Sequence, residues 1–399
     1  VIRLTAGHRA VVEEKPEVKK AGGVYYTPAY IVDYIVKITV GKLCEGKTPK
    51  QITRLRILDP ACGSGSFLIG AYEHLLNYHR DWYLSDGPSK HMNAIYQGAG
   101  GQWRLTTQER KRILLNNIYG VDIDSQAVEV TKLSLLLKVL EGENRDTLTR
   151  QLKMWRERAL PDLGNNIKCG NSLIGPDYFA GQLLPDQDAM RRINPFDWKG
   201  EFPSIFPSPS KGEGKGEGGG GGFDAVIGNP PYIRMEGFKE LKDYLKAHYA
   251  SHDERSDLYA YFIERGHRLL AERGRFGMIV SNKFLRANYG KPLRGFLNTR
   301  ATIESIVDFA GLPVFVGATV RTIVLLTSRD PNRQGTMFYS PPLPAEKFAA
   351  VSGGSLTVEQ AIASETHEVA PVSLRQGVWR FGKAWDDKLL ARLKAHCIP

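Results

Sequence analysis

Short apolar runs and amphipathic stretches alternate along most of the chain. Residues 57–59 are an apolar run, which is followed by a turn of small residues and by the pattern FLIGAYEHLL, whose apolar positions recur at helical spacing. A second run at residues 117–121 precedes a helical pattern that begins at Ser125, and a third run begins at Phe223. This alternation predicts a doubly wound α/β fold with a mostly parallel sheet.

The same alternation continues toward the C-terminus. Helices are predicted at residues 239–249 and 258–271, the second with strongly amphipathic spacing. Strands are predicted at residues 275–280, 303–309 and 319–326. These elements would continue the wound sheet.

Two stretches interrupt the alternation. Residues 84–103 are rich in glycine and irregular, which predicts an excursion at the rim of a cleft. Residues 207–222 read PSPSKGEGKGEGGGGG, a low-complexity sequence that cannot bury a core. We expect a mobile linker there, either a tolerated insertion or a flexible functional loop.

The turn after the first run, DPACGSGSF, is suited to close contact with a ligand. Gly63 and Gly65 permit a tight backbone turn, and the N–H groups at the start of the next helix favour a carboxylate or a phosphate. A dinucleotide-binding fingerprint needs a third glycine where this chain has Leu68, which argues against NAD. A phosphate loop ending in Gly-Lys-Ser/Thr is also absent from the sequence.

Asp122 ends the second predicted strand. An acidic side chain at the carboxyl end of such a strand usually binds a ribose. The alternative is that Asp122 caps the following helix, although Asp124 or Ser125 is better placed for that role.

The third run leads directly into Asn229-Pro230-Pro231-Tyr232. Asn229 offers a side-chain carbonyl, the prolines hold the turn rigid and leave the Pro230 carbonyl free, and Tyr232 offers a flat face. A planar amino nitrogen held by two acceptors beneath a ring has a geometry suited to methylation. The alternative is an ordinary surface turn.

These segments together resemble the S-adenosylmethionine-dependent N6-adenine DNA methyltransferases of restriction-modification systems, most closely the methylase part of type IIG enzymes. The resemblance covers roughly residues 20–330 and rests on six segments in the family's order: GVYYTP, DPACGSGSFL, YGVDID, CGNSLIG, FDAVIGNPPY and SDLYAYFIERG. It implies a seven-stranded, Rossmann-like methyltransferase sheet, S-adenosyl-L-methionine as cofactor and double-stranded DNA as partner.

The resemblance also implies residue roles. Thr27 and Pro28 would cover the methionine end of the cofactor, and Asp122 would bind its ribose hydroxyls, with Ile123 as a further cofactor contact. Asn171 and Ser172 would face its adenine, although many relatives have Asp in place of Asn171. The remaining cofactor contacts would come from Asp59, Ala61, Gly63, Gly65 and Phe67.

The chemistry requires positioning rather than a strong base. If Asn229 and the Pro230 carbonyl each accept one hydrogen of adenine N6, the nitrogen lone pair can point at the methyl group for direct transfer. A base inside a duplex cannot reach that position, so it must be flipped out, with Tyr232 as its stacking partner. Phe315 would close the other face of the base, or else belong to the core.

The charge supports a nucleic-acid partner. Lys and Arg number 54 against 43 Asp and Glu, a formal net charge of +11. The basic residues nearest the catalytic segment are candidate phosphate contacts, although solvated helix faces would have the same sequence. They are Lys239, Lys242 and Lys246, with Arg286, Lys291, Arg294 and Arg300 further on.

Other residue types bound the function. The four cysteines, at positions 44, 62, 169 and 397, have no CxxC spacing, which predicts a reducing compartment and neither a disulfide framework nor a metal site. No apolar run reaches transmembrane length and no signal peptide is present. We therefore expect a bacterial or archaeal cytoplasmic protein with no membrane partner.

The domain prediction has three parts. Residues 1–20 are an N-terminal remnant or linker, residues 21–330 form the methyltransferase domain, and residues 331–399 begin a C-terminal target-recognition domain. The resemblance implies that nuclease or specificity segments belong to the same full-length protein.

Alternative functions remain open at this point. A similar site can methylate a protein glutamine at N5, or cytosine at N4, and the chain could be a non-catalytic DNA-binding subunit of a defence complex. The GVYYTP segment and the C-terminal extension favour DNA as the substrate, and intact Asn229 and Asp59 argue for catalysis. The motifs do not define a recognition sequence.

Overall fold

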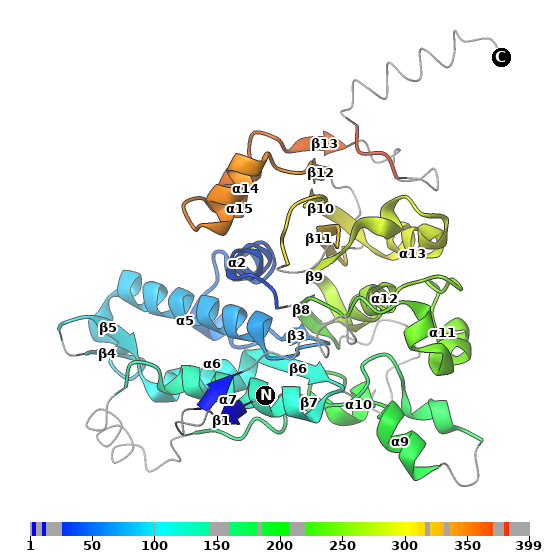
Figure 1. Ribbon diagram of the computed structural model, residues 1–399. Coiled ribbons are helices and arrows are strands. Elements are labelled where there is room, and N and C mark those ends of the chain that lie inside the picture. Colours follow the sequence, from blue (N-terminus) through cyan, green and yellow to red (C-terminus); the bar gives the residue numbers. More distant parts are fainter. Residues whose placement is uncertain are drawn as a thin grey trace, which may run out of the picture.

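A nine-stranded mixed sheet runs through the centre of the molecule in the order β13-β12-β10-β11-β9-β8-β3-β6-β7 (Figure 1). This computed structural model describes residues 2–4, 10–12, 26–98, 100–143, 160–181, 186–207, 221–315, 320–330, 336–369 and 379–382. Most of the linker predicted at residues 207–222, most of residues 1–20 and most of the pattern at residues 372–399 lie outside the described residues.

The first five strands of this sheet in chain order are parallel. They are β3 (Ile57–Asp59), β6 (Ile118–Asp122), β7 (Ile167–Cys169), β8 (Phe223–Gly228) and β9 (Leu270–Ser281). β11 (Thr322–Ser328) is antiparallel to both β9 and β10 (Thr302–Asp308). The prediction of a doubly wound, mostly parallel α/β sheet is therefore confirmed.

Two further strands enlarge the sheet beyond the seven that were predicted. β12 (Met337–Ser340) pairs in parallel with β10, and β13 (His367–Val369) pairs antiparallel with β12. Without them the outer edge of β10 would lack its hydrogen-bonding partner strand. Both strands follow residue 330, so this part of the predicted target-recognition domain extends the sheet, and the domain boundary itself stays a prediction.

The strands divide their side chains between two cores, one on each face of the sheet. Ala225 and Ile227 of β8 belong to the first core, and Val226 between them belongs to the second. Helices α2 (Ala29–Val36), α5 (Ser66–Asp86), α6 (Thr107–Asn117), α7 (Ser125–Leu140), α14 (Ala345–Ser352) and α15 (Val358–Ile362) contribute to the first. Helices α10 (Trp198–Glu201), α12 (Tyr259–Leu269) and α13 (Lys291–Arg300) contribute to the second.

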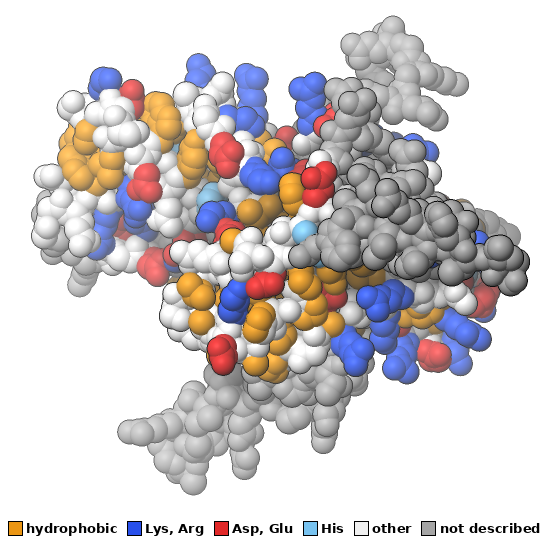
Figure 2. Space-filling view, turned by 90° about the horizontal axis from the view of Figure 1, so that it is seen from above, with side chains coloured by type: hydrophobic (Ala, Val, Ile, Leu, Met, Phe, Trp, Pro, Cys, Tyr) orange, Lys and Arg blue, Asp and Glu red, His pale blue; other side chains and the backbone are white. Residues whose placement is uncertain are grey.

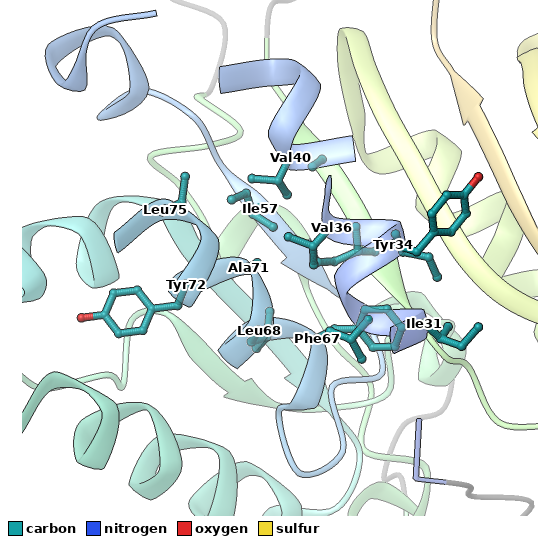
Figure 3. Packing of buried hydrophobic residues seen from close by; sticks show 14 of the residues in the cluster. Ile31, Tyr34, Val36, Val40, Ile57, Phe67, Leu68, Ala71, Tyr72 and Leu75 are labelled. Carbon is teal, nitrogen blue, oxygen red and sulfur yellow. The ribbon is translucent and has the colours of Figure 1, made fainter. Parts of the chain in front are cut away.

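Helix α2 packs against α5 in front of the first strand of the sheet. Figure 3 shows Ile31 and Val36 of α2 close to Phe67 and Leu68 of α5, with Ile57 of β3 behind them. Tight packing of this kind fixes the segment that precedes α2 relative to the loop between β3 and α5.

Several predicted elements differ in detail. The excursion at residues 84–103 is more ordered than expected, because α5 continues to Asp86 and β4 (Ile95–Gln97) pairs with β5 (Trp103–Leu105). The helix predicted at residues 239–249 is a 3-10 turn, Lys239–Leu241, followed by α11 (Lys242–His248). The helix predicted at residues 258–271 ends at Leu269, where β9 begins.

The remaining elements are short. The bounds are β1 (Ile2–Leu4), β2 (Ala10–Val12), a π-helical turn at Lys37–Gly41, α3 (Lys42–Cys44), α4 (Pro49–Ile52), α9 (Gln187–Ile193) and 3-10 turns at Pro88–His91, Pro176–Phe179, Met235–Gly237, Asn282–Leu285 and Asn288–Gly290. No helix in the described part of the chain has the length and apolarity that a membrane span requires.

Candidate functional site

A pocket of about 440 Å³ opens where the loops after β3, β6, β7 and β8 meet. Its volume lies within the usual range for small-molecule sites, and ligands of open α/β sheets bind at this edge. The lining residues are Pro60, Ala61, Gly63, Asp122, Ile123, Asp124, Ala127, Gly170, Asn171, Ser172, Leu173, Asn229, Pro231, Ile233, Phe238, Leu241, Leu258 and Phe262. Two other hollows, of about 480 and 290 Å³, contain no residue from the loops after β3 and β8.

The loop after β3 makes the tight backbone turn that its glycines predicted. Gly63 and Gly65 have φ angles of 52° and 86°, and Gly65 directly precedes α5. The Thr131 hydroxyl of α7 donates to the Gly63 carbonyl at 2.7 Å, and a Cβ on Gly65 would lie 2.9 Å from the Thr131 methyl carbon. Gly63 lines the pocket, whereas Gly65 lets the loop pack closely on α7.

Asp122 holds this loop in place from the end of β6. One carboxylate oxygen accepts a hydrogen bond from the Gly63 N–H at 2.8 Å, and the other accepts from the Asp124 N–H at 2.9 Å. Asp124 caps α7 by accepting from the Gln126 N–H, so Asp122 does not serve as the cap. Burial raises the pKa of Asp122. The adjacent Ile123 is 51% exposed and also lines the pocket.

Asp59 lies beneath the pocket rather than on its surface. Its side chain is 1% exposed and accepts a hydrogen bond from the Ala61 N–H at 3.0 Å. Burial raises its pKa to about 8, against the lowering effect of this hydrogen bond, and the charge of Asp122 raises the pKa further. Phe67 is 3% exposed and belongs to the first core (Figure 3), so neither residue lines the pocket.

Asn171 and Ser172 line the pocket from the loop after β7. The Asn171 side-chain oxygen accepts from the Leu173 N–H at 3.1 Å, and the Ser172 hydroxyl donates to the Pro60 carbonyl at 2.5 Å. The first bond shapes the loop after β7, and the second ties it to the loop after β3.

The segment Asn229–Tyr232 follows β8 directly, as predicted. Asn229 and Pro231 line the pocket, and Pro230 is buried. The Asn229 side-chain nitrogen donates to the Thr27 hydroxyl oxygen at 3.0 Å. Thr27 is 4% exposed and Pro28 half-buried, and neither lines the pocket.

The aromatic residues predicted to stack on a base lie together behind this segment. The Tyr232 hydroxyl donates to the Ile279 carbonyl of β9 at 3.0 Å. Its ring centroid lies 6.1 Å from that of Phe315, at an interplanar angle of 63°. At this angle the two rings meet edge to face and not as a parallel pair. Phe315 is 3% exposed and belongs to the first core.

Sequence comparisons identify the family. The model of the Eco57I restriction-modification methylase matches residues 116–315, and the model of the N-6 DNA methylase matches residues 13–160. The type II restriction enzyme and methyltransferase RM.Eco57I of Escherichia coli is 32% identical over 320 residues, which cover 79% of this chain and 29% of that protein. This chain belongs to the Eco57I restriction-modification methylase family.

Other proteins are also similar to most of the chain. The type II methyltransferase M.BstVI of Geobacillus stearothermophilus is 27% identical over 72% of the chain and 38% of that protein. The chain thus spans well under half the length of these curated relatives. The solved DrdV–DNA complex matches with a TM-score of 0.55 at 15% identity, over 91% of this chain and 32% of DrdV, which supports the fold.

One wall of the pocket was not predicted from the sequence. Ile233, Phe238 and Leu241 follow the Asn229–Tyr232 segment, and Leu258 and Phe262 come from the start of α12. The four-residue separation of Leu258 and Phe262, which places both on one helix face, could have suggested the last two. Among the described residues, no cluster of His, Cys, Asp and Glu is arranged to hold a metal ion.

The basic residues that were candidate phosphate contacts differ in their exposure. Lys239 and Lys246 are exposed, whereas Lys242 forms an ion pair with Glu254. Arg294 is 2% exposed and donates to the Phe284 and Ala287 carbonyls, so it fits neither a phosphate contact nor a solvated helix face. Arg286, Lys291 and Arg300 are exposed. Figure 2 shows Lys and Arg side chains spread over one face of the molecule, with a group near one edge.

Proposed function

We propose that this chain is the methyltransferase core of a restriction-modification enzyme and methylates adenine N6 in double-stranded DNA. The observation that carries the proposal is the placement of Asn229 on the wall of the pocket formed by the loops after β3, β6 and β7. A side-chain acceptor for an amino group thus adjoins a cavity of cofactor size. The family assignment supports the same reaction.

The residues of the pocket fit S-adenosyl-L-methionine, which supplies an electrophilic methyl group when bound. Asp122 offers carboxylate oxygens suited to ribose hydroxyls, and each of these oxygens retains a second lone pair beyond its bond to the loop. The apolar side chains of Ile123, Phe238 and Phe262 suit an adenine ring. Thr27, Pro28, Asp59, Gly65 and Phe67 would act indirectly in this arrangement, because they do not line the pocket.

The catalytic segment would position the target amine. The Asn229 side-chain oxygen and the Pro230 carbonyl would each accept one N6 hydrogen, which leaves the lone pair directed toward the pocket. Pro231 keeps the turn rigid. The protein needs no strong base for this step, because N6 becomes acidic as it takes the methyl group, and its surplus proton can then pass to water at the open pocket.

A base in a duplex must leave the stack to reach Asn229. Tyr232 would provide the stacking face, since its hydroxyl bond to the Ile279 carbonyl fixes the direction of the ring. Phe315 would contact the base only after the edge-to-face pair with Tyr232 opens, so its first contribution is to support the Tyr232 ring. The net charge of +11 suits a DNA partner, and a cytoplasmic location in a bacterium or archaeon would give access to it.

The test is expression in a host without adenine methylation, followed by single-molecule sequencing of the host DNA. We expect N6-methyladenine within a defined motif, lost in Asn229→Ala and kept in Asn77→Ala, which changes an exposed asparagine of α5. Detection of N4-methylcytosine instead would mean that the substrate is cytosine and not adenine. If the chain binds S-adenosylmethionine but leaves the DNA unmodified, the proposal that this chain by itself methylates DNA is wrong.

A further inference from the structure

Arg265 joins two walls of the pocket that come from different parts of the chain. One wall includes Leu258 and Phe262, at the start of α12, and Arg265 follows at helical spacing on the same face of this helix. The other wall is the loop after β7, in which Leu173 is 1% exposed and lines the pocket. The Arg265 Nη2 atom donates to the Leu173 carbonyl at 3.1 Å, which ties the helix directly to the loop.

Tyr249 makes a second connection between the same groups. A guanidinium N–H can only donate, so the Tyr249 oxygen accepts from the Arg265 Nε atom at 2.9 Å, and the hydroxyl hydrogen goes to the Leu173 carbonyl at 2.7 Å. Burial raises the pKa of Tyr249 to about 12, although the charge of Arg265 lowers it, so the hydroxyl keeps this hydrogen at neutral pH. The direction of each bond is therefore fixed.

These bonds hold the loop that carries Asn171. The Leu173 N–H donates to the Asn171 side-chain oxygen at 3.1 Å, and the Leu173 carbonyl accepts from both Arg265 and Tyr249. The peptide groups on both sides of the Leu173 Cα atom are thus bonded, which leaves this residue little freedom. Because Asn171 and Phe262 both line the pocket, a movement of the loop relative to α12 would change the width of the pocket.

We infer that Arg265 is a positioning residue for the adenosine part of the cofactor, acting through the Leu173 carbonyl. This inference rests on the proposed function and deepens it, because that function assigns S-adenosyl-L-methionine to this pocket. A flat purine needs a gap of fixed width, and a gap that is already rigid costs less free energy on binding. Arg265 itself does not line the pocket, so its loss should weaken binding without removing a direct ligand contact.

The test is calorimetric titration with S-adenosylmethionine and with methylthioadenosine, a neutral compound that keeps the adenosine part and lacks the amino-acid part. Arg265→Met removes the bonds to Tyr249 and Leu173, and we expect the Kd of both ligands to rise about tenfold. Tyr249→Phe leaves the direct bond from Arg265 to the loop, so the rise should be about threefold. Arg110→Met is the matched control and should bind as the wild type does, because the half-buried Arg110 donates to the Val139 and Glu141 carbonyls away from this pocket.

The two ligands separate an effect of shape from an effect of charge. Equal rises in Kd support positioning, whereas a rise for only one ligand would mean that the charge of Arg265 matters and would overturn the inference. Wild-type Kd values in both Arg265→Met and Tyr249→Phe would also overturn it. At saturating cofactor and DNA, kcat should stay within about twofold of the wild type, because only binding is affected. A fall in kcat with an unchanged Kd would contradict this role.

The binding measurements do not depend on methylation. If Arg265→Met does not fold, Tyr249→Phe and its control still decide the result. If the wild type binds both ligands but methylates no DNA, the proposed function fails, while the Kd values still test the role of Arg265. A wild-type chain that binds neither ligand would overturn both proposals.

Discussion

The carboxyl group of Asp59 lies against the backbone of Gly228. A Cβ atom on residue 228 would come within 2.7 Å of an Asp59 side-chain oxygen and 3.2 Å of its carboxyl carbon. Gly228 is the last residue of β8 and immediately precedes Asn229. The contact therefore joins the loop that lines the pocket after β3 to the segment that would position the target amine.

Gly228→Ala should damage both stability and activity. Asp59 is buried and bound to the Ala61 N–H, so it has little freedom to move away from a new methyl group. We expect a loss of about 1–3 kcal/mol in the free energy of unfolding, as for other overpacked sites. Gly295→Ala is the control, because a Cβ there would meet no atom within 4 Å. Denaturant unfolding of both variants checks the prediction, and equal stability of the two would contradict it.

The raised pKa of Asp59 predicts a particular pH dependence of stability. The folded protein holds the Asp59 proton up to a pKa of about 8, whereas the unfolded chain loses it near the ordinary value of 3.8. Between these values the folded state binds more protons, so the contribution of Asp59 favours folding at low pH and is lost as the pH rises toward 8. Asp59→Asn, which cannot ionise, should lack this dependence.

Urea unfolding at several pH values between 4 and 9 measures the effect. As the pH rises, the free energy of unfolding of the wild type should fall relative to that of Asp59→Asn. Asp81→Asn, at an exposed carboxylate of α5, should follow the wild-type curve. Parallel curves for the wild type and Asp59→Asn would show that Asp59 ionises normally in the folded protein.

Residues next to strand ends could be placed from the sequence. Asp122 is the last residue of one apolar strand, and Asn229 immediately follows another. The carboxyl ends of parallel strands meet at one edge of a sheet. Chain continuity alone therefore brings the two into one site. Gly63 follows for the same reason, because its turn lies between β3 and α5.

Contacts between distant segments could not be predicted in this way. No local pattern specifies that Thr27 bonds Asn229, or that the edge of β10 pairs with β12. Phe67 belongs to a loop motif, yet as a residue of α5 it faces the first core, toward α2. Arg294 looked like a surface cation, but it lies on the side of α13 that also buries Leu293 and Leu297. Three-dimensional packing decides each of these cases.

Tyr244 holds in place the apolar pocket wall that includes Phe238 and Leu241, so Tyr244→Phe should weaken cofactor binding. Its hydroxyl accepts from the Gly175 N–H at 3.0 Å and donates to Asp177 at 2.9 Å, which ties α11 to the segment after Asn171. Loss of these bonds should raise the Kd of S-adenosylmethionine about fivefold, which corresponds to about 1 kcal/mol, the typical contribution of one hydrogen bond.

Calorimetric titration of the cofactor checks this prediction. Tyr96→Phe is the matched control, because the Tyr96 hydroxyl donates to Glu143 near the β4–β5 hairpin. Its Kd should equal that of the wild type. If both variants bind the cofactor with the wild-type Kd, the hydrogen bonds of Tyr244 are not required for cofactor binding and the prediction is wrong.

Tyr232 should contribute through its ring more than through its hydroxyl. Tyr232→Phe keeps the stacking face and loses only the bond to the Ile279 carbonyl, so we expect kcat/KM for DNA to fall less than about tenfold. Tyr232→Ala removes the face, and stacking on a base is worth about 1–3 kcal/mol, which corresponds to a fall of roughly tenfold to hundredfold.

A base that is easier to flip should distinguish stacking from a general structural effect. In DNA with a mismatch opposite the target adenine, unpairing costs less, so Tyr232→Ala should recover part of its activity relative to the wild type. A variant with Phe315 changed to Leu should show a smaller loss, because Phe315 supports the Tyr232 ring from the edge and is itself buried. Equal losses for Tyr232→Phe and Tyr232→Ala on both substrates would mean that the hydroxyl anchor, and not the aromatic face, is what the reaction requires.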